Sequence, residues 1–221
     1  MKPPKILISG LFRSGKSTLA RMIAKESPNS VLMDEEYSQA NRFLPLFLNR
    51  LEVNGVHYNQ FAYGCQLLFM QNRVRRETLC KDPNKYYIID RSIYEDRHIF
   101  AFLMSQLGIM SKDEYNDYRN MFEKIVRNMD PPDTFILLNS DAEKCFARVK
   151  ARNKPSDNWI TYDIMKKFDE LYRYRLKDRV LRSHPNIKMI EIDTLTHKTP
   201  ESMAQEALAK LSKIYGDKFL T

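Results

Sequence analysis

Residues 10–18 of the chain read Gly10-Leu11-Phe12-Arg13-Ser14-Gly15-Lys16-Ser17-Thr18, between an apolar run at 5–9 and a helix-period run at 19–25. The pattern GxxxxGK[ST], in the order strand, loop and helix, is typical of a phosphate-binding loop (P-loop). Its glycines let the backbone wrap around phosphates, and amides at the start of the helix donate to an anion. The stretch therefore predicts a nucleoside triphosphate site, with Lys16 at the β- and γ-phosphates and Ser17 as a ligand of Mg²⁺. The candidate triphosphate-binding residues of this loop are Gly10, Arg13, Ser14, Gly15, Lys16, Ser17 and Thr18.

Four further apolar, β-branched runs alternate with helix-period stretches along the chain. They lie at 31–33, 86–89, 134–138 and 188–192. Continuous apolar runs of this length are typical of parallel strands that helices cover on both faces. The order predicts an α/β fold: a five-stranded parallel sheet with helices on both faces, in a single domain over residues 1–221.

Three short signals predict where helices begin. The runs Ser111-Lys112-Asp113-Glu114 and Ser140-Asp141-Ala142-Glu143 both fit the capping box, in which Ser and Glu each satisfy a free backbone amide of the other. Thr199-Pro200 has a capping residue before proline at the first helical position. We expect a helix to begin at each of these three points.

The composition excludes several classes of protein. With 221 residues, 43% of them hydrophobic, the chain can build a sizeable core, so disorder is excluded as its main state. The longest apolar stretch, 99–110, is well short of the roughly 20 residues that a membrane-spanning helix needs. The start, Met1-Lys2-Pro3-Pro4, leads directly into the first strand and leaves no room for a leader peptide. Cys65, Cys80 and Cys145 are odd in number and widely spaced, so neither a disulfide framework nor a zinc site is indicated, and a cytoplasmic location is expected.

The net charge of +8 suggests an anionic partner, which could be nucleic acid, acidic lipid or a triphosphate. The span 144–182 alone contributes +7 of this charge. Within it, Arg148, Arg152 and Lys154 precede the helix-breaking Pro155, and we interpret them as a basic lid that closes on the triphosphate. Since no helix-turn-helix, finger or aromatic-interleaved strand pattern accompanies the charge, phosphate chemistry is favoured, and neither a nucleic-acid nor a membrane partner is expected.

Charged residues directly follow two of the predicted strands. Asp90-Arg91 comes at the end of the third strand, and Asp34-Glu35-Glu36 at the end of the second. Ligands of open α/β sheets bind at the carboxyl ends of the strands, so both clusters are expected beside a ligand. One carboxylate of the second cluster is a candidate to take a proton from an attacking hydroxyl.

The run Asp90-Arg91-Ser92-Ile93-Tyr94-Glu95-Asp96-Arg97-His98-Ile99-Phe100-Ala101 resembles the acidic-Arg-Ser motif of the deoxyribonucleoside kinases, of the deoxycytidine, deoxyguanosine and deoxyadenosine kinase type. Gln66 and Arg73, seven residues apart on one predicted helix, match two base-reading positions of that family, and residues 148–154 resemble its lid. The resemblance covers about residues 5–176. It implies a P-loop kinase fold with a lid at about 148–160, ATP as phosphate donor with Mg²⁺, a deoxynucleoside as acceptor, and a homodimer or tetramer.

The resemblance also implies catalytic roles. Glu35 would be the general base that accepts the proton of the nucleoside 5′-hydroxyl, although Glu36 differs from it by only one position. Arg91 would hold that carboxylate and the 5′-oxygen. Asp90, with Ser17, would hold Mg²⁺ directly or through water. The lid residues Arg148 and Arg152, with Lys154 behind them, would stabilise the γ-phosphoryl group during transfer, and Lys16 would act from the P-loop.

For the acceptor, the resemblance implies that Gln66 hydrogen-bonds the base edge, with Arg73 and Asp96 as a charged pair beside it. Asp157 would contact the sugar 3′-hydroxyl. Tyr58 is the candidate for the sugar-binding tyrosine of the family, and Tyr63 is a weaker one. Family members that act on amino-bearing bases keep the charged pair. Deoxyadenosine, deoxyguanosine or deoxycytidine is therefore favoured over thymidine.

Two alternatives stay open at this stage. A nucleoside monophosphate kinase of the thymidylate kinase type shares the P-loop, the strand-end Asp-Arg and a basic lid. It would need a cationic pocket for the phosphate of its acceptor, which Arg73, Arg75 and Arg76 could supply. A nucleic-acid 5′-end kinase, or a nucleotide-dependent binder of nucleic acid, is supported only by the net positive charge.

Overall fold

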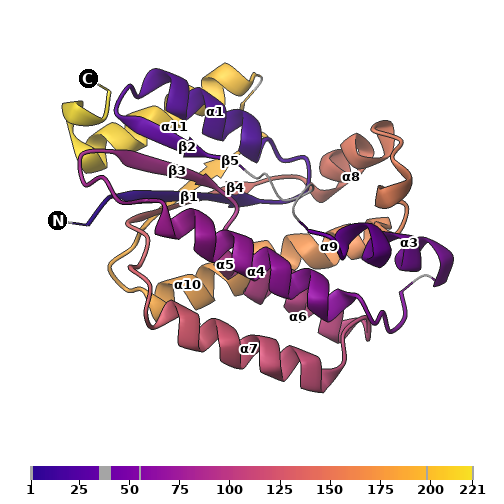
Figure 1. Ribbon diagram of the computed structural model, residues 1–221. Helices are drawn as coiled ribbons and strands as arrows, with labels where there is room; N and C mark the ends of the chain where they lie inside the picture. Colours follow the sequence, from indigo (N-terminus) through magenta and orange to yellow (C-terminus); the bar gives the residue numbers. More distant parts are fainter. Residues whose placement is uncertain (1, 35–40, 55, 198, 221) are drawn as a thin grey trace.

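The predicted strands form a five-stranded, all-parallel sheet (Figure 1). The computed structural model describes residues 2–34, 41–54, 56–197 and 199–220. The strands are β1 (Lys5–Gly10), β2 (Ser30–Met33), β3 (Tyr86–Asp90), β4 (Thr134–Asn139) and β5 (Lys188–Asp193). Their order across the sheet is β2-β3-β1-β4-β5, so the strand that leads into the P-loop lies at the centre.

Helices cover both faces of the sheet (Figure 1). Because side chains of a strand alternate between faces, β1 contributes to two separate cores. Ile6 and Ile8 pack with α1 (Lys16–Glu26) and α11 (Pro200–Tyr215) on one face. Leu7 packs into the larger core on the other face. The α/β prediction is confirmed.

The larger core carries most of the remaining helices. In chain order, the elements beyond α1 and the strands are α3 (Leu44–Asn54), α4 (Ala62–Thr78), α5 (Ile93–Glu95), the π-helical turn η1 (Asp96–Phe100), α6 (Ala101–Gln106), α7 (Lys112–Val126), α8 (Ala142–Ala151), the 3₁₀ turn η2 (Pro155–Asp157), α9 (Tyr162–Glu170), the π-helical turn η3 (Leu171–Leu176), α10 (Lys177–Ser183) and the 3₁₀ turn η4 (Asp217–Phe219). Figure 1 shows α3 and α8 at the end of the molecule toward which β1 runs.

Two of the three predicted helix starts are confirmed. Ser111 caps α7 with a full capping box, and the Thr199 hydroxyl accepts from the amide of Ser202. The third prediction is wrong by one residue. Asp141 caps α8 by accepting from the amide of Lys144, 2.8 Å away, because the hydroxyl of Ser140 instead accepts from Thr194.

The apolar stretch 99–110 supplies core rather than an exposed face, since Ile99, Ala101, Leu103 and Met104 are all buried. In the described part of the chain no helix combines the length and the apolar character needed to cross a bilayer. The three cysteines are buried free thiols. Burial raises the pKa of Cys65 to about 12 and that of Cys80 to about 11, so both stay protonated.

His98 makes the stability of the fold sensitive to acid. It is 7% exposed, and burial together with Arg97, Arg175 and Arg179 lowers its pKa from 6.5 to about 3. Between these two values the unfolded chain binds a proton at His98 and the native chain does not, so the free energy of unfolding falls as the pH falls. From pH 7 to pH 5 the expected loss is about 2 kcal/mol.

Urea unfolding of the wild type and of His98→Gln at both pH values tests this prediction. The variant should lose about 2 kcal/mol less than the wild type over that pH interval. The exposed His57→Gln is the matched control and should behave as the wild type. An equal acid loss in wild type and His98→Gln would contradict the assignment.

Candidate active site

The P-loop has the backbone geometry that phosphate binding requires. A Cβ at Gly10 would lie 2.9 Å from Ser14 Oγ and 3.0 Å from Leu138 Cβ, so only glycine fits at the turn out of β1. Gly15 has φ +100° at the N-terminus of α1, a conformation that glycine adopts without strain. The loop therefore exposes the first backbone amides of the eleven-residue helix α1, and these amides can donate hydrogen bonds to an anion.

Lys16 is buried against this loop. Its Nζ donates to the carbonyl oxygens of Gly10 and Leu11, 2.8 and 2.7 Å away. Ser14 Oγ is buried beneath the same turn without a hydrogen-bond partner. The loop thus holds an ammonium group and a buried hydroxyl close to the helix N-terminus, an arrangement suited to an anion.

The end of β3 meets the start of α1 through Ser17 and Asp90. Ser17 Oγ donates to Asp90 Oδ2 at 2.5 Å, and the fully buried Asp90 has a second carboxylate oxygen, Oδ1, without a partner. A hydroxyl and a carboxylate are hard oxygen donors of the kind that Mg²⁺ prefers. An orphaned buried carboxylate oxygen beside the P-loop fits a cation there.

Arg91, the next residue, is held in an unusual conformation. Its φ is +62°, in the left-handed region that non-glycine residues rarely adopt. The guanidinium stacks over the rings of Phe12 and Phe100, 5.3 and 5.0 Å from their centroids. Arg91 is therefore a buried cation with a defined orientation beside the P-loop.

The predicted lid residues border the same space. Arg148 lies on α8, and its Nη1 donates to the carbonyl of Arg13, 3.2 Å away. Arg152 and Lys154 follow directly after α8, and all three cationic side chains of the lid are exposed. Because they line one cavity together with the P-loop, the structure brings the predicted lid to the predicted triphosphate site.

The predicted base-reading residues, which come from α4 and η1, also line this cavity. Arg73 Nε donates to Asp96 Oδ2 at 3.2 Å, and both side chains are 3% exposed. The amide oxygen of Gln66, another buried residue, has no hydrogen-bond partner. The structure thus pairs Arg73 with Asp96, as expected, and leaves an unsatisfied acceptor next to open space.

A cavity of about 1060 Å³ connects these groups. The predicted site residues that line it are Arg13, Gly15, Lys16, Ser17, Thr18, Gln66, Arg73, Arg91, Asp96, Arg148, Arg152, Lys154 and Asp157. Gly10, Ser14 and Asp90 are buried behind this lining. Glu35 and Glu36 lie outside the described residues.

The structure does not bring Tyr58 to the cavity. Tyr58 is 54% exposed, and its hydroxyl donates to Glu114 Oε1 at 3.1 Å on the surface. Tyr63 packs against the larger core instead of lining the cavity. The structure therefore gives no support to Tyr58 or Tyr63 as the sugar-binding tyrosine.

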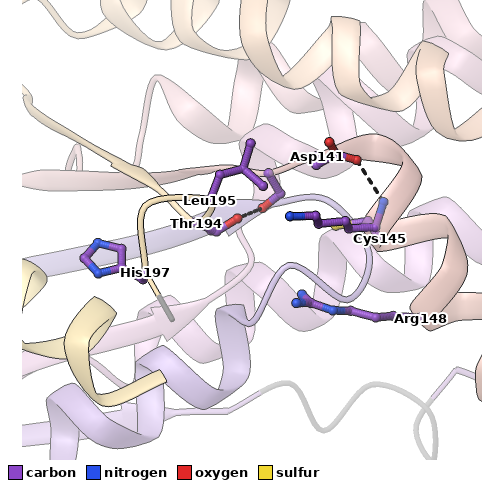
Figure 2. Close-up of a pocket in the computed structure, with 8 residues that line it drawn as sticks. Asp141, Cys145, Arg148, Thr194, Leu195 and His197 are labelled. Carbon is purple, nitrogen blue, oxygen red and sulfur yellow. Dashed lines mark hydrogen bonds between the residues drawn. The ribbon is translucent and has the colours of Figure 1, made fainter. Parts of the chain in front are cut away.

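A second, smaller cavity of about 90 Å³ lies between the start of α8 and the loop after β5 (Figure 2). Arg148 lines both cavities, and Thr194, Leu195 and His197 line the smaller one from the loop. Figure 2 shows two hydrogen bonds between residues that line the smaller cavity. The Thr194 hydroxyl donates to the Ser140 hydroxyl, and the Lys144 amide donates to the Asp141 carboxylate. Sequence reasoning missed this cavity because the loop carries no recognisable pattern.

Sequence reasoning also missed the apolar residues that line the large cavity and the buried carboxylate of Glu95. The apolar walls of the large cavity come from side chains scattered over many elements, namely Phe12, Leu44, Phe47, Leu48, Phe69, Phe100, Met104, Val149, Trp159 and Ile160. The Glu95 carboxylate is buried below and accepts from Tyr172 Oη at 2.9 Å and from the Ser92 amide at 3.1 Å. Burial raises the pKa of Glu95. The local sequence around Glu95 does not indicate this burial, because its partner Tyr172 lies 77 positions away.

Comparison with known proteins agrees with this geometry. Residues 6–214 match the deoxynucleoside kinase family. The chain belongs to that family. Membership confirms the predicted enzyme class, an ATP-dependent nucleoside kinase, and the predicted resemblance.

Individual relatives of this deoxynucleoside kinase are distant. It is 30% identical over 153 residues to the deoxyadenosine/deoxycytidine kinase of Bacillus subtilis, a match that covers 67% of this chain and 65% of that protein. It is 26% identical over 202 residues to the deoxyadenosine kinase of Dictyostelium discoideum, covering 90% of this chain and 76% of that one. A solved deoxyadenosine kinase from M. mycoides, with dCMP and a flexible dCDP bound, superposes with a TM-score of 0.76 at 20% identity, over 95% of this chain and 99% of the other. That superposition confirms the P-loop kinase fold.

Proposed function

We propose that this kinase transfers the γ-phosphoryl group of ATP to the 5′-hydroxyl of a deoxyribonucleoside and so serves nucleotide salvage. The observation that carries the proposal is one large cavity that two groups of residues line together. Lys16 and Ser17 line it from the P-loop, and Gln66 lines it together with the paired Arg73 and Asp96. A cavity of about 1060 Å³ has room for a nucleoside and for the phosphates of a second nucleotide.

In this proposal the donor phosphates lie on the P-loop amides and Lys16. Arg148 and Arg152, with Lys154, neutralise the charge that spreads over the transferring group. The smaller cavity, which shares Arg148 with the larger one, takes the end of ATP remote from the γ-phosphate. Phosphoryl transfer depends mainly on positioning and on charge neutralisation, and these exposed cations on and directly after α8 can supply both.

We propose that Ser17 and Asp90 hold Mg²⁺, directly or through water. The support is the 2.5 Å contact of the two side chains and the unpartnered Oδ1 of Asp90. When bound, the cation neutralises charge on the β- and γ-phosphate oxygens. Two residues of the chain act on the acceptor in this proposal. Arg91 orients the 5′-oxygen, and Glu35, by resemblance, takes the proton of the 5′-hydroxyl.

The acceptor end favours an amino-bearing base. Gln66 has a free acceptor, and the buried Arg73–Asp96 pair offers fixed donors and acceptors, so a base with the wrong edge would leave buried polar groups unpaired. The names of the B. subtilis and D. discoideum relatives, which include deoxyadenosine and deoxycytidine, agree with this preference. We therefore propose deoxyadenosine, deoxyguanosine or deoxycytidine over thymidine, with Asp157 near the sugar.

The arginines that a nucleoside monophosphate kinase would need are otherwise engaged. Arg73 pairs with Asp96, and Arg76 donates to four backbone carbonyl oxygens. Arg75 is exposed and does not line the cavity. An uncharged nucleoside is thus a better acceptor for this site than a monophosphate.

Transfer of labelled γ-phosphate from ATP to a panel of acceptors tests the proposal. The panel contains four deoxynucleosides, the ribonucleosides, deoxynucleoside monophosphates and a 5′-hydroxyl oligonucleotide. We expect label on the deoxynucleosides, with kcat/KM for thymidine at least about tenfold below that for the best substrate. Label chiefly on monophosphates or on the oligonucleotide would reject the proposal in favour of the corresponding alternative.

The same panel tests the base-reading pair. Arg73→Met combined with Asp96→Leu should reduce discrimination among the four deoxynucleosides at least about tenfold. Removing both charges together avoids leaving one buried and unpaired, so the fold should persist. Lys5→Met combined with Glu77→Leu is the matched control, because it removes another buried ion pair, of 2.8 Å, away from the cavity. If the selectivity of both double variants equals that of the wild type, the Arg73–Asp96 pair is purely structural.

A homodimer and a cytoplasmic location are also proposed from the family resemblance. The apolar stretch 99–110 is largely taken up by the core, so other surfaces would form the contact. Light scattering of the purified chain measures the oligomeric state directly.

A further inference from the structure

Arg76 joins the carboxyl ends of two strands through main-chain contacts. It lies on α4, and its Nη1 donates to the carbonyl oxygens of Met33 (3.1 Å), the last residue of β2, and of Asp34 (3.0 Å), the residue after it. The same nitrogen donates to Asp90 O at 3.0 Å, and Nη2 donates to Arg91 O at 2.9 Å, both at the end of β3. One guanidinium therefore holds four carbonyl oxygens from two neighbouring strands.

These contacts begin where the pairing between β2 and β3 ends. The β2–β3 ladder runs only as far as the pair Met33 and Ile89. Beyond it, Asp34 on one strand and Asp90 and Arg91 on the other have no ladder partner between them. The guanidinium of Arg76 links the two chain segments at this point in place of backbone–backbone hydrogen bonds. Its two Nη atoms can donate to oxygens of both segments at once. Charge-assisted hydrogen bonds of this kind are stronger than neutral ones.

The contact to Arg91 has a further effect, since Arg91 is held at φ +62°. A left-handed conformation of a bulky residue persists only where its surroundings over-determine it. Here the Arg91 amide donates to Ile8 O at 3.2 Å, while its carbonyl accepts from Arg76. Hydrogen bonds thus hold both the amide and the carbonyl group of Arg91. The backbone held in this way directs the Arg91 side chain toward the cavity.

We propose that Arg76 is a positioning residue for phosphoryl transfer. It sets the spacing between the ends of β2 and β3, and so keeps Asp90 and Arg91 in register with Asp34, the residue before Glu35. This inference rests on the proposed function, because Asp90, Arg91 and Glu35 matter together only when phosphate is transferred to a hydroxyl. Arg76 acts through the backbone of its neighbours and does not line the cavity.

Three variants separate positioning from folding. Arg76→Met removes the charge and with it the four bonds to main-chain oxygens, and Arg76→Lys keeps the charge but offers one nitrogen instead of a fork. Arg75→Met is the matched control, since its side chain is the exposed neighbour on the same helix. For each, kcat and KM are measured with the best deoxynucleoside, the Kd of ATP by titration calorimetry, and the melting temperature by circular dichroism.

We expect Arg76→Met to lower kcat on the order of 10²-fold, because small displacements of reacting groups cost about that much. The KM of the deoxynucleoside and the Kd of ATP should change less than about threefold, since the P-loop and the base-reading pair are untouched. Arg76→Lys should fold as the wild type and still have kcat at least about tenfold below it. Arg75→Met should match the wild type in every measurement.

Other outcomes are equally decisive. If Arg76→Lys has wild-type kcat, or if kcat falls only in proportion to the folded fraction, Arg76 serves the fold alone and the inference is overturned. If Arg76→Met does not fold, Arg76→Lys carries the test. A wild type that labels none of the deoxynucleosides would reject the proposed function instead. In that case a crystal structure of Arg76→Lys decides the inference: Arg91 should leave the left-handed region, and an unchanged φ would refute it.

Discussion

Replacing Glu35 with glutamine is expected to lower kcat by a factor of about 10² to 10⁴ while leaving the Kd of ATP nearly unchanged. Glutamine keeps the size of the side chain but cannot accept the proton of the 5′-hydroxyl. Steady-state turnover with the best deoxynucleoside, together with calorimetric titration of ATP, measures both quantities. The acidic limb of the kcat/KM pH profile should also disappear in the variant, because the group that titrates there has been removed.

Two neighbouring variants make this prediction specific. Glu36→Gln differs by one position and distinguishes the two glutamates that the sequence pattern alone confuses. Asp34→Asn is the second control, since the Asp34 carboxylate pairs with Arg21 at 3.1 Å and is partly exposed. Both controls should retain turnover within about fivefold. If Glu36→Gln shows the large loss and Glu35→Gln does not, the general base is Glu36, and near-wild-type turnover in all three variants would reject a base in this segment.

The strands could be predicted from the sequence because their signal is local. Each predicted run lies within a strand of the structure, with ends that differ by no more than a residue, as for 86–89 and β3 (Tyr86–Asp90). Buried parallel strands need apolar residues on both faces, and no other element of that length has this requirement. The P-loop was predictable for the same reason, since Gly10 and Gly15 are required by the backbone path itself.

Other features depend on contacts that a local pattern does not contain. The wrong cap of α8 is one: Ser140 and Asp141 are both good capping residues, and a bond from Thr194, 54 positions away, decides between them. The π-helical turn η1 (Asp96–Phe100) is another, because a helix-period pattern does not indicate an extra residue in a turn. Arg76 is a third, since its four acceptors come from the ends of two strands that lie far from it in sequence.

The positive charge of the span 144–182 divides into two parts in the structure. Arg148, Arg152 and Lys154 line the cavity. Beyond the lid, Arg173 pairs with Asp169 at 2.8 Å and Arg182 with Asp178 at 2.7 Å, each one helical turn apart. Pairs of this kind at the surface contribute little to stability and need no ligand. Of the two parts, only the lid therefore places its positive charge at the cavity that the P-loop lines.

Asp90→Asn is the second substitution with a large expected effect. The Asp90 carboxylate is fully buried, bonds Ser17 through Oδ2 and leaves Oδ1 without a partner. Asparagine has the same shape and can still accept from Ser17, so the change removes a negative charge and little else. If Asp90 holds Mg²⁺, kcat should fall on the order of 10²- to 10³-fold, the range for losing one group that stabilises charge in the transition state.

The dependence on Mg²⁺ distinguishes this role from a structural one. The Mg²⁺ concentration for half-maximal activity should rise at least about tenfold in Asp90→Asn, with a melting temperature close to that of the wild type. Asp133→Asn is the matched control, because that carboxylate precedes β4 at the opposite end of the sheet and accepts from the Lys5 amide. It should leave the Mg²⁺ dependence unchanged. An Asp90→Asn enzyme with reduced kcat but wild-type Mg²⁺ dependence would mean that Asp90 orients Ser17 and Arg91 without contacting the cation.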